Sequence, residues 1–192
     1  MTTDTDPPRL TITDPAVMRA LAHPARLAII EHLAGGATGT ATELAAVCGL
    51  SPSATSYHLR ALARYGLVRE APGRGDARER VWSRSDHQGL RIDLDPAGDA
   101  ESRAAERSLV TVVLDRDDAL ARSWIDRAYG EPAEWRNAAT LSSALVLLTA
   151  EELTALNQAV SDLLEPYLAG RRADPPPGAR RVRVVVRSFP TD

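Results

Sequence analysis

The sequence predicts a mainly helical protein with a small β component, in which a domain of short helices precedes a helical and α/β C-terminal region. Three observations carry this prediction. Helix caps followed by apolar residues at helical spacing recur between residues 14 and 65. Two extended runs joined by turn residues then predict a hairpin. A second series of helix signals starts at Asp99 and ends in an alternating apolar run.

Two short helices are expected to open the first domain, after a loose polar arm over residues 1–13. Asp14 followed by proline is an N-cap acid before a residue suited to the first helical turn. The second helix, ARLAIIEHLA, follows a break at His23 and stops at Gly35 and Gly36. At this boundary we expect His23 to form local hydrogen bonds.

A third helix is predicted from Thr40, since Glu43 lies three residues later and completes a capping box. Gly49 ends this helix. Its apolar face is expected to consist of Leu44, Val47 and Cys48.

The fourth helix is expected to run from the cap at Ser51 to about Tyr65, before Gly66. Helical spacing points three side chains inward, those of Thr55, Leu59 and Leu62. The outward face then carries Ser53, Ser56, Tyr57 and Arg60. His58 lies between the two faces, where packing is the simpler role.

A β-hairpin is predicted next, because LVREA and ERVWSRS are extended runs joined by PGRGDAR. Its tip is basic and carries Arg74 and Arg78. Trp82 is expected to anchor the hairpin on the core.

Beyond the hairpin, residues 99–129 are predicted to be mostly helical, with a break near residues 115–118. Thr149 and Glu152 form a second capping box before a helix from AEELTAL onward. SSALVLLT precedes this helix, and VRVVVRSF, in which valine alternates with arginine, follows it. This order predicts an α/β unit with two adjacent strands.

The charge distribution favours a nucleic-acid contact on one surface only. The 192 residues carry 23 basic and 26 acidic side chains, and every basic one is arginine. Residues 51–84 hold seven arginines against three acids, whereas residues 96–192 hold twelve against fifteen. A general polyanion binder would be more basic overall.

The sequence also excludes several classes. One cysteine rules out an internal disulfide framework and a multi-cysteine metal site. No apolar run approaches the roughly 20 residues of a membrane helix, and the N-terminus has acids where a signal peptide needs a basic flank. A cytoplasmic protein that does not contact membranes is expected.

Two helices joined by a tight turn and followed by a hairpin allow the second helix to enter the major groove of double-stranded DNA. Hydroxyl and guanidinium groups on that helix would contact base edges or phosphates. The helix N-terminus and the basic hairpin tip would hold the backbone. The candidate DNA-binding residues are Ser51, Ser53, Ser56, Tyr57, Arg60, Arg64, Arg74 and Arg78.

Three segments, LAHPARLAIIEHL, GLSPSATSYHLRALARYGLV and RGDARERVW, resemble the winged helix-turn-helix transcriptional regulators of the ArsR type. The resemblance covers about residues 15–85. It implies a homodimer that binds a palindromic operator and usually represses. The later runs LSSALVLLTAEELTAL and RRVRVVVRSFP are similar to the longer, non-metal branch. This organisation predicts a DNA-binding domain over residues 14–95 and a dimerisation or effector domain over residues 96–192.

The sequence departs from the metal-sensing members of that type, because ELAAVCG has Cys48 alone where they carry two cysteines. Residues 99–129 contain no histidine for the alternative site of zinc sensors. We therefore expect no metal and no cofactor, and Cys48 is interpreted as a core residue.

Other functions stay open beside this interpretation. The same fold occurs in protein-binding adaptors that do not contact DNA. An apolar small-molecule effector would need a pocket in the C-terminal half, for example between Trp124, Trp135 and Leu145. An enzyme is disfavoured, because GxxxxGK[ST], GxSxG, HExxH and strand-linked GxGxxG motifs are missing from the sequence.

Overall fold

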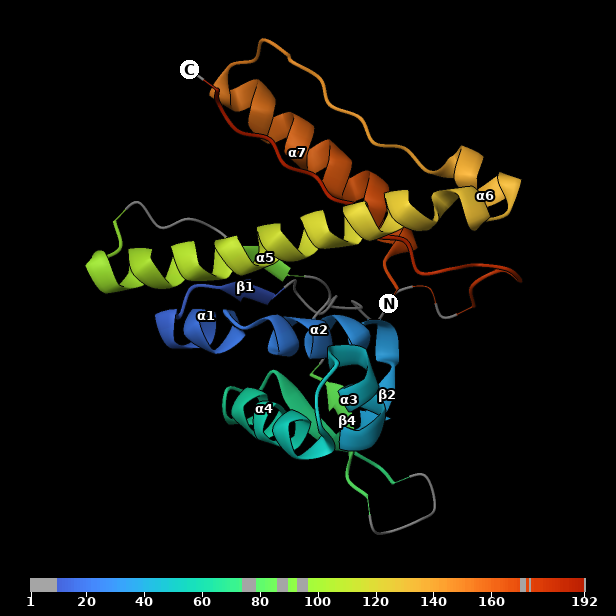
Figure 1. The fold of residues 1–192 in the computed structure, drawn as a ribbon. Coiled ribbons are helices and arrows are strands. Elements are labelled where there is room, and N and C mark those ends of the chain that lie inside the picture. Colours follow the sequence, from blue (N-terminus) through green and yellow to red (C-terminus); the bar gives the residue numbers. More distant parts are fainter. Residues whose placement is uncertain are drawn as a thin grey trace, which may run out of the picture.

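The computed structural model describes residues 10–73, 79–85, 90–92, 97–169, 172 and 174–191. As predicted, it is mainly helical with a small sheet (Figure 1). The helices are α1 (Pro15–Leu21), α2 (Pro24–His32), α3 (Ala41–Cys48), α4 (Pro52–Arg64), α5 (Ala100–Arg127), α6 (Ala133–Ala138) and α7 (Ala150–Leu164). Short 3-10 turns are η1 (Ala34–Gly36), η2 (Ala128–Gly130) and η3 (Glu165–Tyr167). The strands are β1 (Leu10–Ile12), β2 (Thr38–Thr40), β3 (Val68–Ala71), β4 (Val81–Arg84) and β5 (Leu90–Ile92).

The predicted caps set the ends of the first helices. The Asp14 carboxylate accepts a hydrogen bond from the Ala16 amide at 2.7 Å and begins α1. The Nδ1 atom of His23 accepts one from the Ala25 amide at 3.1 Å and begins α2, which confirms its local role. Thr40 and Glu43 form the expected capping box of α3.

The hairpin of β3 and β4 is confirmed, but it belongs to a larger sheet than the sequence indicated. Strand β2 pairs antiparallel with β4, which gives the order β2–β4–β3. Strands β1 and β5 form a separate parallel pair. The loose arm expected over residues 1–13 is therefore wrong for its last part, because residues 10–12 are held by β5 and Ile12 is buried. Residues 1–9 lie outside the described part.

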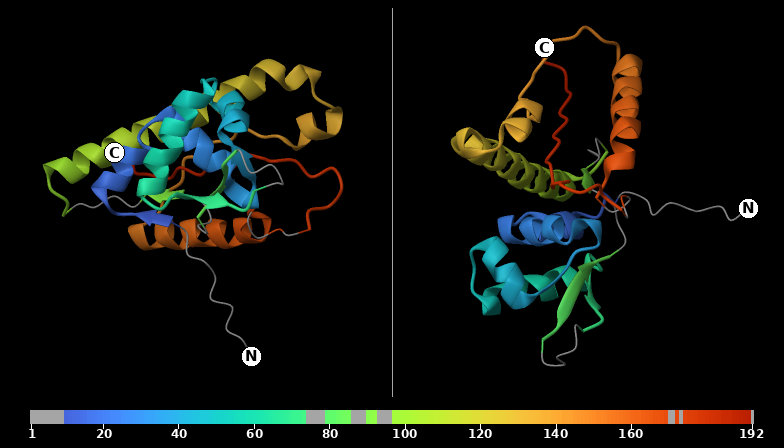
Figure 2. Two further views of the ribbon diagram at one scale, coloured as in Figure 1. Left: turned by 90° about the horizontal axis from the view of Figure 1, so that it is seen from below. Right: turned by 90° about the vertical axis from the view of Figure 1, so that its right-hand side faces the viewer.

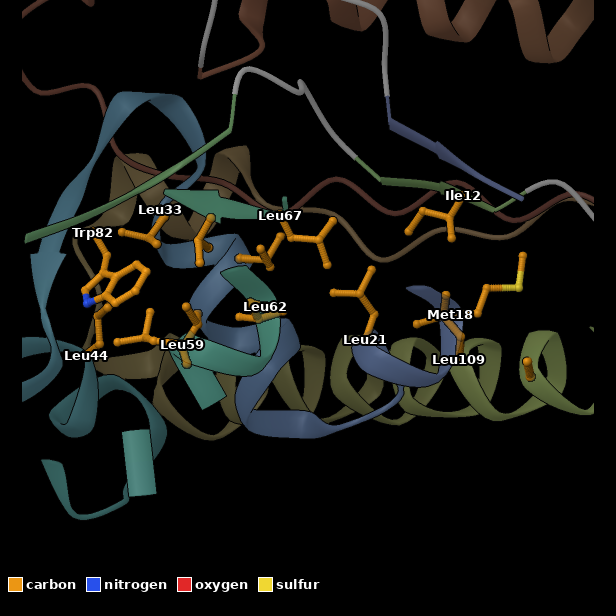
Figure 3. Close-up of a cluster of buried hydrophobic side chains, with 14 residues drawn as sticks. Ile12, Met18, Leu21, Leu33, Leu44, Leu59, Leu62, Leu67, Trp82 and Leu109 are labelled. Carbon is orange, nitrogen blue, oxygen red and sulfur yellow. The ribbon is translucent and has the colours of Figure 1, made fainter. Parts of the chain in front are cut away.

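One apolar core joins the helices, the sheet and the start of α5 (Figure 3). Trp82 projects from β4 into this core, so its predicted anchoring role is confirmed. Leu109 of α5 is fully buried in the same cluster. Each such leucine contributes about 2 kcal/mol by leaving water. The shared core therefore fixes α5 against α1. The core side chains labelled in Figure 3 are Ile12, Met18, Leu21, Leu33, Leu44, Leu59, Leu62, Leu67, Trp82 and Leu109.

Helix α5 is continuous, so the break predicted near residues 115–118 is wrong. That prediction rested on the charged run DRDD. The structure pairs these charges with groups outside the helix: Arg116 with Glu31, and Asp118 with Arg187 at 3.1 Å. These ion pairs join α5 to segments far along the same chain, and they leave the backbone hydrogen bonds of α5 intact. In Figures 1 and 2, α5 lies between α1 and α7, and α4 lies at the opposite end of the molecule from α7.

The C-terminal region contains α6 and α7, but the two strands predicted there do not form among the described residues. Residues 139–149 and 179–190 are irregular. Their apolar side chains are exposed, and Leu147 has 98% of its surface in contact with solvent. A strand requires a partner for its backbone groups, and these two segments do not pair with each other. Among the described helices, none combines the length and the apolar character that a membrane span requires.

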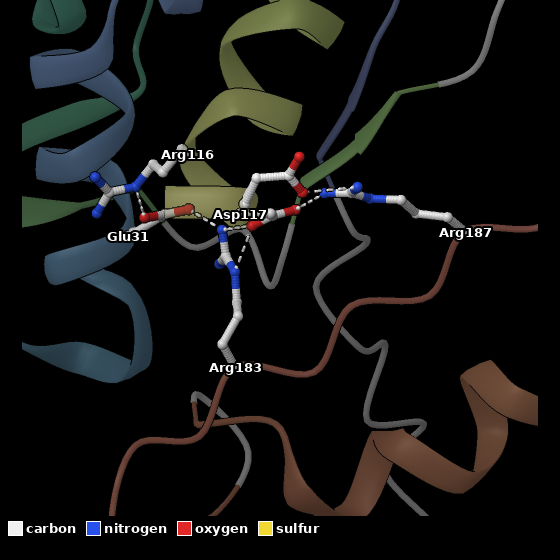
Figure 4. Close-up of polar contacts among 6 residues, drawn as sticks. Glu31, Arg116, Asp117, Arg183 and Arg187 are labelled. Atoms are coloured by element: carbon white, nitrogen blue, oxygen red, sulfur yellow. Dashed lines mark hydrogen bonds and ion pairs between the residues drawn. The ribbon is translucent and has the colours of Figure 1, made fainter. Parts of the chain in front are cut away.

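Arginines attach the C-terminal segment to the rest of the chain (Figure 4). Arg183 binds both Glu31 of α2 and Asp117 of α5, the latter at 2.7 Å. Arg187 contacts Asp117 and Asp118. Burial by itself lowers the pKa of Arg183, but the two carboxylates outweigh it and the pKa is raised. Only 9% of the Asp117 side chain is exposed, so these arginines replace the water that its carboxylate loses on burial.

We predict that Arg183→Met lowers the free energy of unfolding by about 1 to 3 kcal/mol, because it leaves the Asp117 carboxylate poorly paired. Urea denaturation followed by circular dichroism measures this change. Arg127→Met is the control: its partner Glu131 lies 3.7 Å away, one turn along the surface, and such a pair contributes about 0.5 kcal/mol or less. Equal losses for the two variants would contradict the prediction.

Candidate nucleic-acid interface

Helices α3 and α4 pack against each other through a tight turn. Gly49 ends α3 with φ 64° and ψ 32°, a left-handed conformation that favours glycine. The Ser51 hydroxyl then accepts a hydrogen bond from the Ala54 amide at 3.2 Å and caps α4. Leu44 of α3 and Leu59 of α4 are both fully buried in the core. The two helices thus form a rigid helix-turn-helix unit. The expected burial of Val47 is wrong, since it lies on the exposed side of α3.

Helix α4 has the two faces that its spacing predicts. Leu59, Leu62 and Thr55 are fully buried, and the Thr55 hydroxyl donates to the Ser51 carbonyl at 3.0 Å. The opposite face is open to solvent. Of the predicted DNA-binding residues, Ser51, Ser53, Tyr57, Arg60 and Arg64 are exposed and Ser56 is partly exposed. Arg74 and Arg78 of the hairpin tip lie outside the described residues.

A hollow of about 370 Å³ lies beside this outward face, between α1, α2 and α4. We call it the arginine hollow. Helix α4 contributes Tyr57, Arg60, Arg64 and the adjoining Tyr65, while Arg19 comes from α1 and Arg26 from α2. Sequence analysis missed Arg19, Arg26 and Tyr65. Their own segments carry no signal for them, because only the tertiary packing of three helices brings them together.

The arginine hollow has a positive lining. Its lining, as far as the structure describes the chain, has four guanidinium groups and no carboxylate. Arg19 has an exposed ion pair with Glu101 at 2.8 Å, and Arg26 donates to the Ala20 carbonyl at 2.8 Å. Within the described part of the chain, Arg60 and Arg64 have no acidic partner. Excess positive charge beside an exposed helix face is the electrostatic pattern of a surface that receives phosphate groups.

Behind the hollow, two histidines pack together at the junction of α2 and α4. The rings of His23 and His58 are 4.5 Å apart between centroids, and the Arg26 Nε atom donates to His58 Nδ1 at 3.4 Å. Burial lowers the pKa of both histidines, and the positive charge of Arg26 lowers it further. Both rings therefore accept hydrogen bonds as neutral groups. The packing role predicted for His58 is confirmed by its burial.

Cys48 packs against the core, as predicted, and its thiol donates to the Ala25 carbonyl at 3.6 Å. Burial raises the pKa of this thiol, which keeps it protonated. In the described ranges, no three histidine, cysteine or acidic side chains gather as metal ligands do.

Two of the side chains expected to line an apolar effector pocket lie in the C-terminal region. Leu145 is 85% exposed, and Arg180 lies over the Trp135 ring at 4.7 Å.

Comparisons with known proteins place the similarity on this unit. A family model described as a helix-turn-helix domain matches residues 21–71. The HTH-type transcriptional regulator YgaV of Escherichia coli (strain K12) is 43% identical over 53 residues. That match spans 28% of this chain and 54% of the relative, about half of its length.

Solved structures with detectable similarity have low overall superposition. A transcriptional regulator homologue from Pyrococcus horikoshii OT3 has a TM-score of 0.32 at 23% identity, over 53% of this chain and 87% of that one. YusO from Bacillus subtilis has a TM-score of 0.34 at 16% identity, over 78% and 79%. ZitR from Lactococcus lactis, in a mutant apo form, has a TM-score of 0.34 at 17% identity, over 76% of this chain and 83% of that one. The family-model match, together with the packing of α3 and α4 and the hairpin that follows them, gives a helix-turn-helix domain in a winged arrangement.

The histidine pair predicts a pH-dependent stability. Because the folded-state pKa of each ring is lowered, the unfolded chain binds more protons below about pH 6.5. The contribution of the two histidines to the free energy of unfolding should therefore be complete above that pH. It should fall as the pH drops toward the lowered pKa values of the folded state. Urea titrations from pH 8 to pH 5 measure the slope.

The variant His23→Asn/His58→Gln keeps a capping oxygen at residue 23 and an acceptor for Arg26 without a titrating ring. We expect a flatter pH profile for it. Profiles of the same slope for both proteins would show that these histidines do not titrate differently on folding.

Proposed function

We propose that the chain is a sequence-specific, DNA-binding transcriptional regulator that reads the major groove with α4. The observation that carries the proposal is the exposed outer face of α4, at the end of the molecule away from α7. This face combines hydroxyls, a phenol and two arginines without an acidic partner among the residues that the structure describes. The name of the E. coli relative, a transcriptional regulator, supports the same role. As a regulator the chain needs no catalytic site.

In this proposal the buried face of α4 orients its outer face. Ser53 and Ser56 approach base edges closely because their side chains are small. Arg60 reaches a guanine edge or a phosphate, and Tyr57 adds a large ring with a polar tip. Arg64 binds phosphates of the DNA backbone, and the sequence predicts the same role for Arg74 and Arg78. The Ser51 hydroxyl caps α4 by accepting from the Ala54 amide. A DNA phosphate is bound beside it by the other backbone N–H groups at the N-terminus of α4.

We further propose that the protein acts as a homodimer of the ArsR type, binds a palindromic operator and represses. Two recognition helices related by a two-fold axis read two half-sites, which is why dimers require palindromes. Residues 14–95 serve as the DNA-binding domain and residues 96–192 as the dimerisation domain. The exposed apolar runs in residues 141–148 and 182–189 support a second copy as the partner, since their side chains are left in water here. A protein-binding adaptor is the alternative function.

Substitution on the face of α4 tests DNA binding. Ser53→Asp places a negative charge in the first turn of α4, where the helix dipole favours it, so the fold is retained. We expect at least a tenfold loss of affinity for a duplex selected from a random pool, because the carboxylate repels phosphate. Fluorescence anisotropy at fixed salt measures the change.

Ser123→Asp is the matched control, with the same charge change on α5 next to Arg127. It should bind within twofold of the wild type. If the wild type binds no duplex, or binds it without salt dependence, the adaptor function replaces the proposed one.

A second prediction concerns the oligomeric state. Sedimentation velocity should give a dimer for the wild type and a monomer for Leu145→Glu/Leu147→Glu, since two charges would be buried between the copies. Val47→Glu, an exposed apolar position on α3, should remain dimeric. A monomeric wild type at micromolar concentration would overturn the dimer.

A further inference from the structure

The arginine hollow has the composition of an anion site. Its guanidinium groups come from three separate helices, so the charge is concentrated by the fold and not by a basic run in the sequence. Arg19, Arg26, Arg60 and Arg64 all line it, and none of the described lining residues is acidic. Like charges brought together in this way cost stability unless an anion occupies the space between them.

The existing contacts leave these arginines able to bind a ligand. Arg26 is held by the Ala20 carbonyl and by His58, so it is a fixed donor at the base of the hollow. In the described part of the chain, Arg19 is bound to Glu101, in a pair whose side chains are 48% and 72% exposed. An exposed pair of this kind contributes little and exchanges readily. Arg60 and Arg64 have no acidic partner among the described residues.

The size and the aromatic lining narrow the class of ligand. A volume of about 370 Å³ lies within the range of small-molecule sites. Guanidinium groups bind tetrahedral phosphate oxygens in pairs, more strongly than a point charge does. Tyr57 and Tyr65 add phenol rings to the wall, against which an aromatic or sugar ring packs.

We propose that the arginine hollow is a binding site for a phosphate group attached to an organic moiety. Two sources share this chemistry, a free phosphate monoester and a phosphate of bound DNA. The site goes beyond the proposed function, because its lining reaches α1 and α2 and a free phosphate monoester needs no duplex. A free phosphate monoester bound in the hollow would engage Arg60, which would then not be available to DNA.

Phenyl phosphate is the probe for the first source. Isothermal titration calorimetry in a buffer free of phosphate and sulfate should show saturable binding of one equivalent to the wild-type chain. Arg19→Gln/Arg64→Gln should weaken it at least tenfold, because two of the four guanidinium groups are lost. Phenol should give no binding. The control Arg122→Gln lies far along α5 from the hollow and should match the wild type within twofold.

Circular dichroism of each variant shows whether it is folded, and the single variant Arg64→Gln provides a second test if the double one is not. The site would be overturned if the wild type shows no saturable phenyl phosphate binding and the double variant loses no more of the salt slope than Arg64→Gln alone. An equal loss of affinity in Arg122→Gln would also overturn it.

Duplex binding identifies the source. If a DNA phosphate occupies the hollow, Arg19→Gln/Arg64→Gln should reduce the slope of log affinity against log salt by about two, and phenyl phosphate should compete with a 20-base-pair duplex. If the slope falls by only about one, as the loss of the backbone contact proposed for Arg64 predicts by itself, while phenyl phosphate still binds, the source is a free monoester. A chain that binds phenyl phosphate but no duplex would support the hollow and overturn the proposed function, so the two failures are distinguishable.

Discussion

The rotation of α4 about its axis is the constraint on which the rest of the interface depends. Leu59 and Leu62 are fully buried in the core, and Thr55 is fixed to the Ser51 carbonyl one turn earlier. Successive residues of a helix are offset by about 100°, so burying these three positions determines where every other side chain of α4 points. The outward direction of Tyr57 and Arg60 is therefore a consequence of leucine packing.

The features that were predictable from the sequence are those decided within a few residues. The caps at Asp14, Thr40 and Thr149 each depend on a side chain and an amide two or three positions away, and all three form. Strands β1 and β2 were not predicted, because each has only three residues and is formed by hydrogen bonds to a strand far along the chain. The break expected in α5 failed for the same reason, since the charges near Asp117 are paired by arginines about 70 residues later.

The candidate site likewise has residues that local sequence predicts and residues that only the tertiary fold brings there. Its outer face on α4 follows from spacing alone, so the positions from Ser51 to Arg64 could be read directly. Arg19 and Arg26 could not, because they sit on other helices and face the site only after α1 and α2 fold against α4. In the C-terminal region, the alternation in residues 182–189 predicted a strand that does not form, and Arg183 and Arg187 are instead paired with carboxylates of the chain. The valines stay exposed, so the chain by itself does not complete a strand there.

The two surfaces of α4 share residues, and this limits how they can be used. Arg60 lines the arginine hollow and also lies on the outward face, and Tyr57 does the same. Arg60 has a single guanidinium, so a side chain directed into the hollow does not bring that group to a base edge in the groove. Binding in the hollow and base reading by Arg60 are therefore antagonistic by geometry, with no movement of helices required. Reciprocity then demands that a duplex engaging Arg60 lowers the affinity of the hollow for a free phosphate by the same factor.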